Sequence, residues 1–193
     1  MVVEDLLNLN EHYGIIYTDP PWEQKRGGYK SVRPNTSGKE LDYNTMKIDD
    51  IIQLHKHVFE NNAATKHNVF IWTIDKYLRQ TEDFMEDLGY VRHARIIWDK
   101  VTGIPTAFTI RYSHEYLLWF YKKGNILMPR EEVRGIYSDV IREKVKKHSK
   151  KPECAYLMLE DMFPNANKLE MFARNTRQGW DSWGNECENK EGN

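Results

Sequence analysis

Residues 13–22 read YGIIYTDPPW, a short apolar run that ends abruptly in an acid, two prolines and a tryptophan. The first six residues are mostly β-branched or aromatic and predict a buried strand. Proline fixes φ at about −65° and keeps the residue before it out of the helical region. We therefore expect Asp19 and Pro20 to be held extended and stiff at the tip of this strand.

Such a tip presents two fixed hydrogen-bond acceptors, the Asp19 carboxylate and the Pro20 carbonyl, beside the flat face of Trp22. This arrangement suits a planar group that carries an NH2, such as the exocyclic amine of adenine. Accepting hydrogen bonds from both N–H groups favours a pyramidal nitrogen whose lone pair can point at an electrophile, and this is electrostatic preorganisation. The alternative is an Asp-Pro-Pro turn with a packed tryptophan.

The composition indicates one soluble globular domain. The chain has 193 residues, of which 40% are hydrophobic and 30% charged, and this size permits a proper core. The first ten residues do not resemble a signal peptide, and no apolar run approaches the roughly 18 residues of a membrane span. Cys154 and Cys187 lie far apart without CxxC spacing, which favours a reducing cytoplasm over a disulfide framework or a zinc site.

Positive charge is concentrated in two segments although the whole chain carries a net charge of −1. Residues 142–151 carry +5 and residues 23–40 carry +3, which leaves −9 for the rest of the chain. Each segment can be a solvated loop. Because both flank other unusual motifs, they are also candidates for a phosphate-facing surface.

Alternating strand and helix patterns predict the fold class. Strands are expected at residues 13–18, 67–73, 91–98, 115–121, near 135–141 and at 168–173, and helices at 48–59, 77–88 and 152–162. This alternation indicates an α/β sheet with some antiparallel pairing late in the chain. Such sheets bind ligands beyond the carboxyl ends of their strands, so the site is expected after residues 18 and 173. His55, on the apolar helix face, is expected to be a packed core histidine.

Four motifs in order carry a resemblance to a known family: DPPW at 19–22, LDYNTM at 41–46, HSKKP at 148–152 and KLEMFARNTRQGWDSWGNE at 168–186. Together they resemble the adenine-N(6) methyltransferases related to the catalytic subunit of the eukaryotic messenger-RNA methyltransferase, in the compact form of bacterial and phage members. The resemblance implies one Rossmann-like methyltransferase domain over residues 1–186, with a flexible tail at 187–193. It also implies a single mixed sheet in permuted order, with the catalytic strand before the cofactor strand.

The resemblance also implies roles for individual residues, with S-adenosylmethionine as methyl donor, S-adenosylhomocysteine as product and no metal. The catalytic motif would be Asp19, Pro20, Pro21 and Trp22. Tyr43 would line the target-base pocket, and Lys151 would face the methionine carboxylate of the cofactor. The other cofactor-binding residues would be Asp5, Leu6, Asp19, Phe172, Arg174, Thr176, Arg177, Asn185 and Glu186. Trp180 and Trp183 are expected to pack beneath the site.

The implied reaction is in-line displacement on an adenine that has been flipped out of the stack or is already unpaired. The residues expected to hold phosphates are Lys25, Arg26, Lys30, Arg33, Lys146 and Lys147. Three functions remain open: a site-specific DNA adenine methyltransferase, the same enzyme acting on RNA, and a non-catalytic nucleic-acid-binding subunit. The intact DPPW favours catalysis, and the resemblance to compact members favours DNA. A homodimer or a partner subunit is a further possibility, and no membrane association is expected.

Overall fold

The computed structural model describes residues 2–3, 5–23, 45–101, 109–145, 150–184 and 187. Its strands are β1 (Tyr13–Thr18), β2 (Ala63–Thr73), β3 (Tyr90–Asp99), β4 (His114–Lys122), β5 (Val140–Arg142), β6 (Lys168–Met171) and β7 (Asp181–Trp183). Its helices are α1 (Ile48–Asn61), α2 (Leu78–Asp87) and α3 (Glu153–Met162), with short 3-10 turns η2 (Asp75–Tyr77) and η3 (Glu131–Val133).

The seven strands form one mixed sheet in the order β5-β3-β4-β2-β1-β6-β7. β1 lies between β2 and β6 and is parallel to both. β4 is antiparallel to β2 and β3, so the predicted antiparallel pairing is present but falls in the middle of the chain. The predicted α/β class with a single mixed sheet is confirmed.

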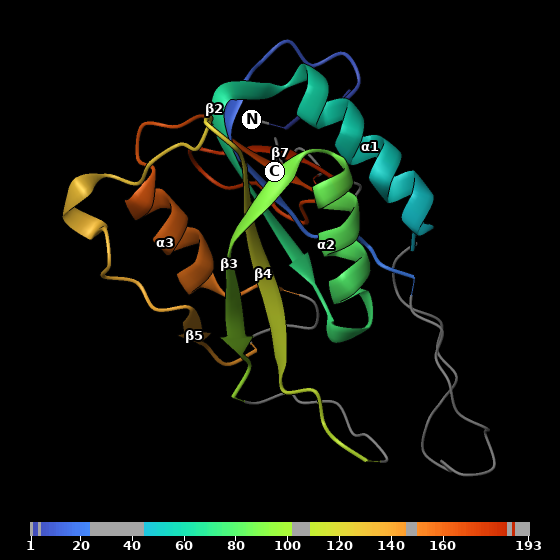
Figure 1. Ribbon diagram of the computed structural model, residues 1–193, viewed down its shortest axis with the longest axis vertical. Helices are drawn as coiled ribbons and strands as arrows, with labels where there is room; N and C mark the ends of the chain where they lie inside the picture. Colours follow the sequence, from blue (N-terminus) through green and yellow to red (C-terminus); the bar gives the residue numbers. More distant parts are fainter. Residues whose placement is uncertain are drawn as a thin grey trace, which may run out of the picture.

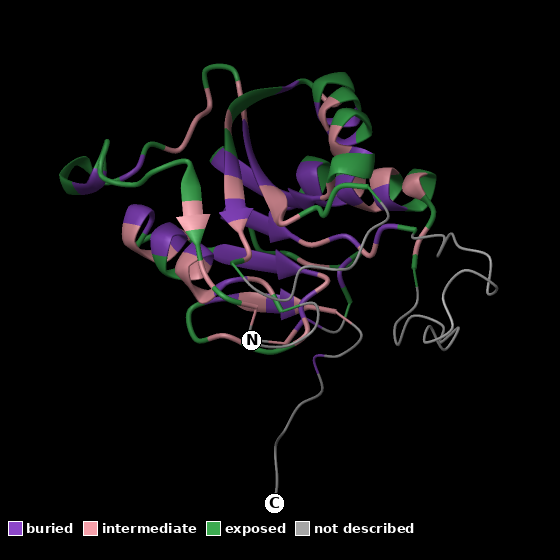
Figure 2. Ribbon diagram, turned by 90° about the horizontal axis from the view of Figure 1, so that it is seen from below, coloured by how far each residue is buried: buried purple, intermediate pink, exposed green. Residues whose placement is uncertain are grey.

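Helices cover both faces of the sheet, α1 and α2 on one side and α3 on the other (Figure 1). Each helix buries an apolar stripe, such as Ile51, Val58 and Phe59 on α1, because residues three, four and seven apart share one helix face. β1 is therefore buried along its whole length, and the strands form the buried centre of the molecule in Figure 2. His55 is fully buried and bonded to Thr18 and to the Ile51 carbonyl, which confirms a core histidine.

Two sequence expectations about strands need correction. The segment 135–141 is mostly a turn, because Gly135 adopts φ +79° and the Tyr137 hydroxyl is bonded to Asp161 of α3. Only Val140–Arg142 pairs with β3 as β5. The last predicted strand ends at Met171 instead of residue 173 because Phe172 adopts φ +60°. The short strand β7, with the sequence DSW, was not predicted.

Several strands meet at one end of the sheet, which we call the carboxyl end. Thr18 of β1 pairs with Ile71 of β2 and with Met171 of β6, so these parallel strands finish together. β4 begins at the same level, since its Tyr116 lies opposite Thr73 near the end of β2. The DPPW motif leaves β1 at this end, as expected for the ligand site of an α/β sheet.

Candidate functional site

Asp19 is placed at the tip of β1 by a main-chain bond to the neighbouring strand β6. Its N–H donates to the Met171 carbonyl of β6 at 3.4 Å, so the chain stays beside β6 for one residue beyond β1. Because side chains alternate along a strand, the Asp19 carboxylate lies on the same face as Tyr17, the face that α3 covers. The side chain remains 21% exposed, so it can be reached from the carboxyl end.

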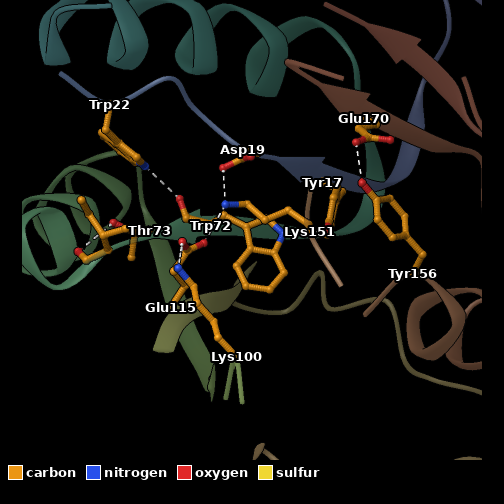
Figure 3. A network of polar contacts seen from close by, with 11 residues as sticks. Tyr17, Asp19, Trp22, Trp72, Thr73, Lys100, Glu115, Lys151, Tyr156 and Glu170 are labelled. Carbon is orange, nitrogen blue, oxygen red and sulfur yellow. Dashed lines mark hydrogen bonds and ion pairs between the residues drawn. The ribbon is translucent and has the colours of Figure 1, made fainter. Parts of the chain in front are cut away.

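The Asp19 carboxylate belongs to a chain of four alternating charges, which we call the charge chain. Lys151 Nζ lies 2.9 Å from Asp19 Oδ1 and 2.7 Å from Glu115 Oε2, and the other Glu115 oxygen lies 2.6 Å from Lys100 Nζ. Lys151 precedes α3, Glu115 is the second residue of β4, and Lys100 directly follows β3. Figure 3 shows the four side chains meeting at the end of β1.

The charge chain shifts the proton affinities of its members. Burial raises the pKa of Glu115, but Lys151 and Lys100 outweigh it and lower that pKa to about 2. Burial opposes the ammonium of Lys151, yet Asp19 and Glu115 together raise its pKa. Asp19 shares Lys151 with Glu115, so burial and the repulsion of Glu115 exceed the attraction of Lys151, and the pKa of Asp19 is raised. Of the two acids in the charge chain, Asp19 therefore accepts a proton more readily.

Trp72 of β2 joins the charge chain to a buried hydrogen-bond network. Lys151 Nζ lies 5.1 Å from the centre of the Trp72 ring, a cation–π contact. The indole N–H of Trp72 donates to the Tyr17 hydroxyl at 2.6 Å. Tyr17 packs on Tyr156 of α3, whose hydroxyl donates to Glu170 at 2.7 Å. Figure 3 shows this path leading from Trp72, below Asp19, to Tyr17, Tyr156 and Glu170 at the right.

The structure corrects the expected stacking role of Trp22 and shows where the carbonyls of the two prolines point. Trp22 is only 5% exposed, its ring stacks on Tyr77, and its indole N–H donates to the Trp72 carbonyl. It is therefore not an open stacking face for a ligand. The Pro20 carbonyl accepts the Trp22 N–H at 2.8 Å, and the Pro21 carbonyl accepts that of Met46 at 2.9 Å. A carbonyl oxygen has two lone pairs, so Pro20 can accept a second hydrogen bond, and its role as an acceptor for the amine stays a prediction.

The N-terminal segment runs beside β7 and then reaches the second half of α1, where the Leu7 carbonyl lies 3.3 Å from His57 Nε2. Val3 N–H donates to the Ser182 carbonyl at 2.9 Å, and Val2 forms a parallel bridge with Ser182. Leu6 is buried, whereas the exposed Asp5 carboxylate accepts hydrogen bonds from the Leu7 N–H and the Asn8 side chain. A role for Asp5 and Leu6 in binding adenine stays a prediction.

The residues after β6 divide into two groups. Phe172 packs on Trp183 and His55, and the positive charge of Arg174 acts on Asp19. Arg177 instead forms ion pairs with Glu153 and Glu160 of α3. These pairs attach the loop to α3, so a role of Arg177 at the cofactor stays a prediction without support from its contacts.

Other predicted residues have simpler outcomes. Thr176 is exposed, and its role at the cofactor stays a prediction. Trp180 is 2% exposed and donates to Glu160, and Trp183 packs on Phe172, as expected for packing residues. The following residues lie outside the part of the chain that the structure describes: Lys25, Arg26, Lys30, Arg33, Tyr43, Lys146, Lys147, Asn185 and Glu186.

Sequence reasoning missed Glu115, Lys100 and Trp72. A signal was present for Glu115, which is an acid at the head of the buried strand EYLLWFY. The signal could not be interpreted from the sequence, because Glu115 reaches Asp19 only through the antiparallel pairing of β4 with β2. This pairing brings the start of β4 to the end of the sheet where Asp19 lies. Lys100 and Trp72 carried no comparable signal, because each stands in an ordinary strand or strand-end context.

Two absences concern the described residues alone. No group of three or more His, Cys, Asp or Glu side chains gathers there in a way that could hold a metal ion. None of the helices described has both the length and the apolar character needed to span a bilayer. Cys154 and Cys187 are free thiols.

The chain is similar to known proteins over most of its length. Residues 13–186 match the model of the MT-A70 family. The chain is 31% identical over 183 residues to an N(6)-adenosine-methyltransferase MT-A70-like protein of Arabidopsis thaliana, covering 90% of this chain and 24% of the relative. It is 29% identical over 185 residues to the type II methyltransferase M.MunI of a Mycoplasma species, covering 89% of this chain and 76% of the relative. Human METTL3, an N(6)-adenosine-methyltransferase catalytic subunit, is 25% identical over 185 residues, with 91% and 28% covered. The chain thus spans about a quarter of the length of its plant and human relatives.

Proposed function

The chain belongs to the MT-A70 family, and from that premise we propose that it transfers the methyl group of S-adenosylmethionine to the exocyclic amine of adenine in DNA. The observation that carries the proposal is the Asp19 carboxylate at the tip of β1, held by Lys151 at 2.9 Å and still partly exposed. An acceptor in this position can bind the amine of a target base.

The side chains at the carboxyl end fit S-adenosylmethionine. This cofactor has a carboxylate, an ammonium and a sulfonium, and Asp19, Lys151 and Arg174 offer one negative and two positive charges there. Lys151 and Arg174 would hold the carboxylate, and Asp19 would hold the ammonium beside the target. Asp5, Leu6, Phe172, Asn185 and Glu186 are the proposed residues around the adenine and ribose. When bound, the cofactor supplies an electrophilic methyl group.

Besides holding the cofactor ammonium, Asp19 has two tasks in the methyl transfer itself. Its carboxylate accepts a hydrogen bond from the adenine amine, orients the nitrogen lone pair and stabilises the positive charge that develops on nitrogen. After transfer the nitrogen must lose a proton, and Asp19 can accept it because burial raises the pKa of this carboxyl. Until that proton is accepted, Lys151 holds the ionised Asp19 in place by their ion pair.

The choice of DNA rests on the similarity to the Mycoplasma type II methyltransferase, most of whose length the chain matches. The chain covers 76% of the Mycoplasma type II methyltransferase but only 24% of the Arabidopsis adenosine methyltransferase. RNA is the second candidate substrate, since the plant and human relatives are named for adenosine. In duplex DNA the target amine lies inside the stack, so the adenine must be flipped out or already unpaired. The target sequence would be read by loops or by a partner subunit.

A non-catalytic role in a complex is the remaining alternative. It would leave the acceptor at the tip of β1 without a function, whereas DPPW is intact and Asp19 is held by Lys151. A protein that only binds nucleic acid should not take up S-adenosylmethionine. Titration of the cofactor into the purified protein by calorimetry therefore separates this alternative from an enzyme.

Methylation of defined oligonucleotides tests the proposal. Purified protein is incubated with methyl-labelled S-adenosylmethionine and with matched single-stranded and double-stranded DNA and RNA, and N6-methyladenine is measured by mass spectrometry. The proposal predicts label in DNA adenine. Label in RNA alone would assign the second candidate, and cofactor binding without label in any substrate would contradict catalysis by this chain alone.

A further inference from the structure

The short turn η2, which comes after β2, makes close contact with the end of the DPPW motif. The rings of Trp22 and Tyr77 are stacked, with centres 5.1 Å apart and planes 18° apart. Both side chains are buried, Trp22 to 5% and Tyr77 to 7% exposure. One face of Trp22 is thus covered by Tyr77, while its indole N–H is bonded to the Trp72 carbonyl.

The same turn also holds the residue after the motif. The Tyr77 hydroxyl donates to the Glu23 carbonyl, and Lys76 Nζ donates to that carbonyl at 3.1 Å. Lys76 Nζ lies 2.8 Å from the Tyr77 hydroxyl as well, so the three groups form one small cluster. The contacts involve the main chain of Glu23 and would form with any residue at that position.

These contacts are important because the motif can do little to hold its own main chain. Pro20 and Pro21 have no N–H, so neither can donate a hydrogen bond to β2 or β6. The main chain after Asp19 is therefore held by the bonds of Trp22 and of the Glu23 carbonyl, together with the bond from Met46 to Pro21.

We propose that Tyr77 and Lys76 are positioning residues for methyl transfer, which act on Asp19 through Trp22 and the two prolines. The inference rests on the proposed function. Tyr77 does not contact Asp19, so its removal should leave cofactor binding nearly unchanged and lower the rate of the chemical step. A misplacement of about 1 Å can lower a reaction rate by roughly 10²-fold.

Tyr77→Leu is the main variant, and Tyr90→Leu is its matched control. Tyr90 is a tyrosine with 3% exposure in the same helix-covered layer, but it lies at the start of β3 and is bonded to His67, away from the carboxyl end. We expect Tyr77→Leu to lower the single-turnover rate by roughly 10- to 100-fold with cofactor affinity changed less than about threefold. Tyr90→Leu should lower the melting temperature but leave the rate of the folded protein unchanged.

Graded variants separate the ring from the hydroxyl. Tyr77→Phe keeps the stacked ring and should restore most of the activity lost in Tyr77→Leu. Lys76→Met changes an exposed side chain. Because it removes one or two hydrogen bonds, it should lower the single-turnover rate by roughly three- to tenfold. If Tyr77→Leu does not fold, Lys76→Met still decides, because a wild-type rate in that variant would overturn the proposal.

A spectroscopic readout makes the test independent of activity. In protein labelled with 5-fluorotryptophan, the resonance of Trp22 is assigned by its loss in Trp22→Phe. The chemical shift of this resonance should change in Tyr77→Leu and remain unchanged in Tyr90→Leu. An unshifted resonance with a wild-type rate in Tyr77→Leu would overturn the positioning role. A wild-type protein that methylates neither DNA nor RNA would contradict the proposed function instead, while the fluorine signal would still report whether Tyr77 orders Trp22.

Discussion

Lys151 Nζ lies 2.9 Å from the Asp19 carboxylate and 2.7 Å from that of Glu115, so one ammonium serves two acids at the tip of β1. An isolated buried carboxylate would be costly, and a shared lysine lowers this cost only partly. The sharing explains why the pKa of Asp19 is raised while that of Glu115 is lowered. A carboxylate held in this way is fixed in place and still able to accept a proton.

Lys151→Met should reduce both cofactor binding and turnover. The variant leaves Asp19 and Glu115 buried without their shared cation, which is strongly destabilising for a buried pair. We expect the rate of methyl transfer to fall by at least about 10²-fold and cofactor affinity to fall as well, measured by single-turnover assay and calorimetry. Lys150→Met, a change at the exposed neighbour, is the control and should leave both quantities near wild type.

Glu115→Gln should lower stability at neutral pH. The folded protein holds the pKa of Glu115 at about 2 instead of 4.5, so this group stabilises the fold above pH 4.5 and the contribution is lost as the pH falls towards 2. We expect a loss of roughly 2–3 kcal/mol at pH 7, measured by urea unfolding, that shrinks steadily below about pH 4.

The control for Glu115→Gln is Glu131→Gln, which removes an exposed acid paired with Arg134 at 3.4 Å. Exposed pairs contribute little, so this variant should unfold like wild type. An equal loss in the free energy of unfolding of both variants at neutral pH would show that the ion pairs of Glu115 in the charge chain do not stabilise the fold.

Glu170→Gln should stabilise the protein at alkaline pH. Burial raises the pKa of Glu170 to about 7 from 4.5, so the folded state loses stability as the pH rises from 4.5 to 7 and stays lower above that. The glutamine carbonyl can still accept from the Tyr156 hydroxyl, and the charge is gone. Urea unfolding should give a gain of roughly 3 kcal/mol or less at about pH 8 and almost none at about pH 4.5. An equal change in the free energy of unfolding at the two pH values would show that the raised pKa of Glu170 does not affect the stability of the fold.

Replacing Lys146 and Lys147 by Ala should weaken nucleic-acid binding equally for all sequences. Two fewer phosphates would be neutralised, so the slope of log affinity against log salt should fall by about 1–2 units. The measurement is fluorescence anisotropy with labelled DNA at several salt concentrations, beside cofactor titrations that should not change. An unchanged salt slope would identify residues 142–151 as a solvated loop and move the search to Lys25, Arg26, Lys30 and Arg33.

The sequence predicts the sheet and the tip of β1 well because both depend on local patterns. The buried run before Asp19 and the periodic faces of α1, α2 and α3 identify their elements without tertiary information. The short strands β5 and β7 depend on pairing with neighbours and on a turn at Gly135, which local patterns do not contain.

The site was predicted in part for a related reason. Asp19 and Lys151 are found through motifs, but Glu115 and Lys100 reach them only because β3 and β4 pair antiparallel in this sheet. The same holds for Trp22, whose burial against Tyr77 depends on the turn after β2. Long-range pairing therefore decides which charged and aromatic groups surround a motif that is itself visible in the sequence.

The central claim is that the Asp19 carboxylate acts on the adenine amine, and Asp19→Ala tests it most directly. The measurement is the single-turnover rate of N6-methyladenine formation in DNA with labelled S-adenosylmethionine, on protein that melts cooperatively and still binds DNA in the anisotropy assay. We predict a loss of at least about 10²–10³-fold in rate with DNA binding retained. A variant that keeps more than half of the wild-type rate would contradict the claim.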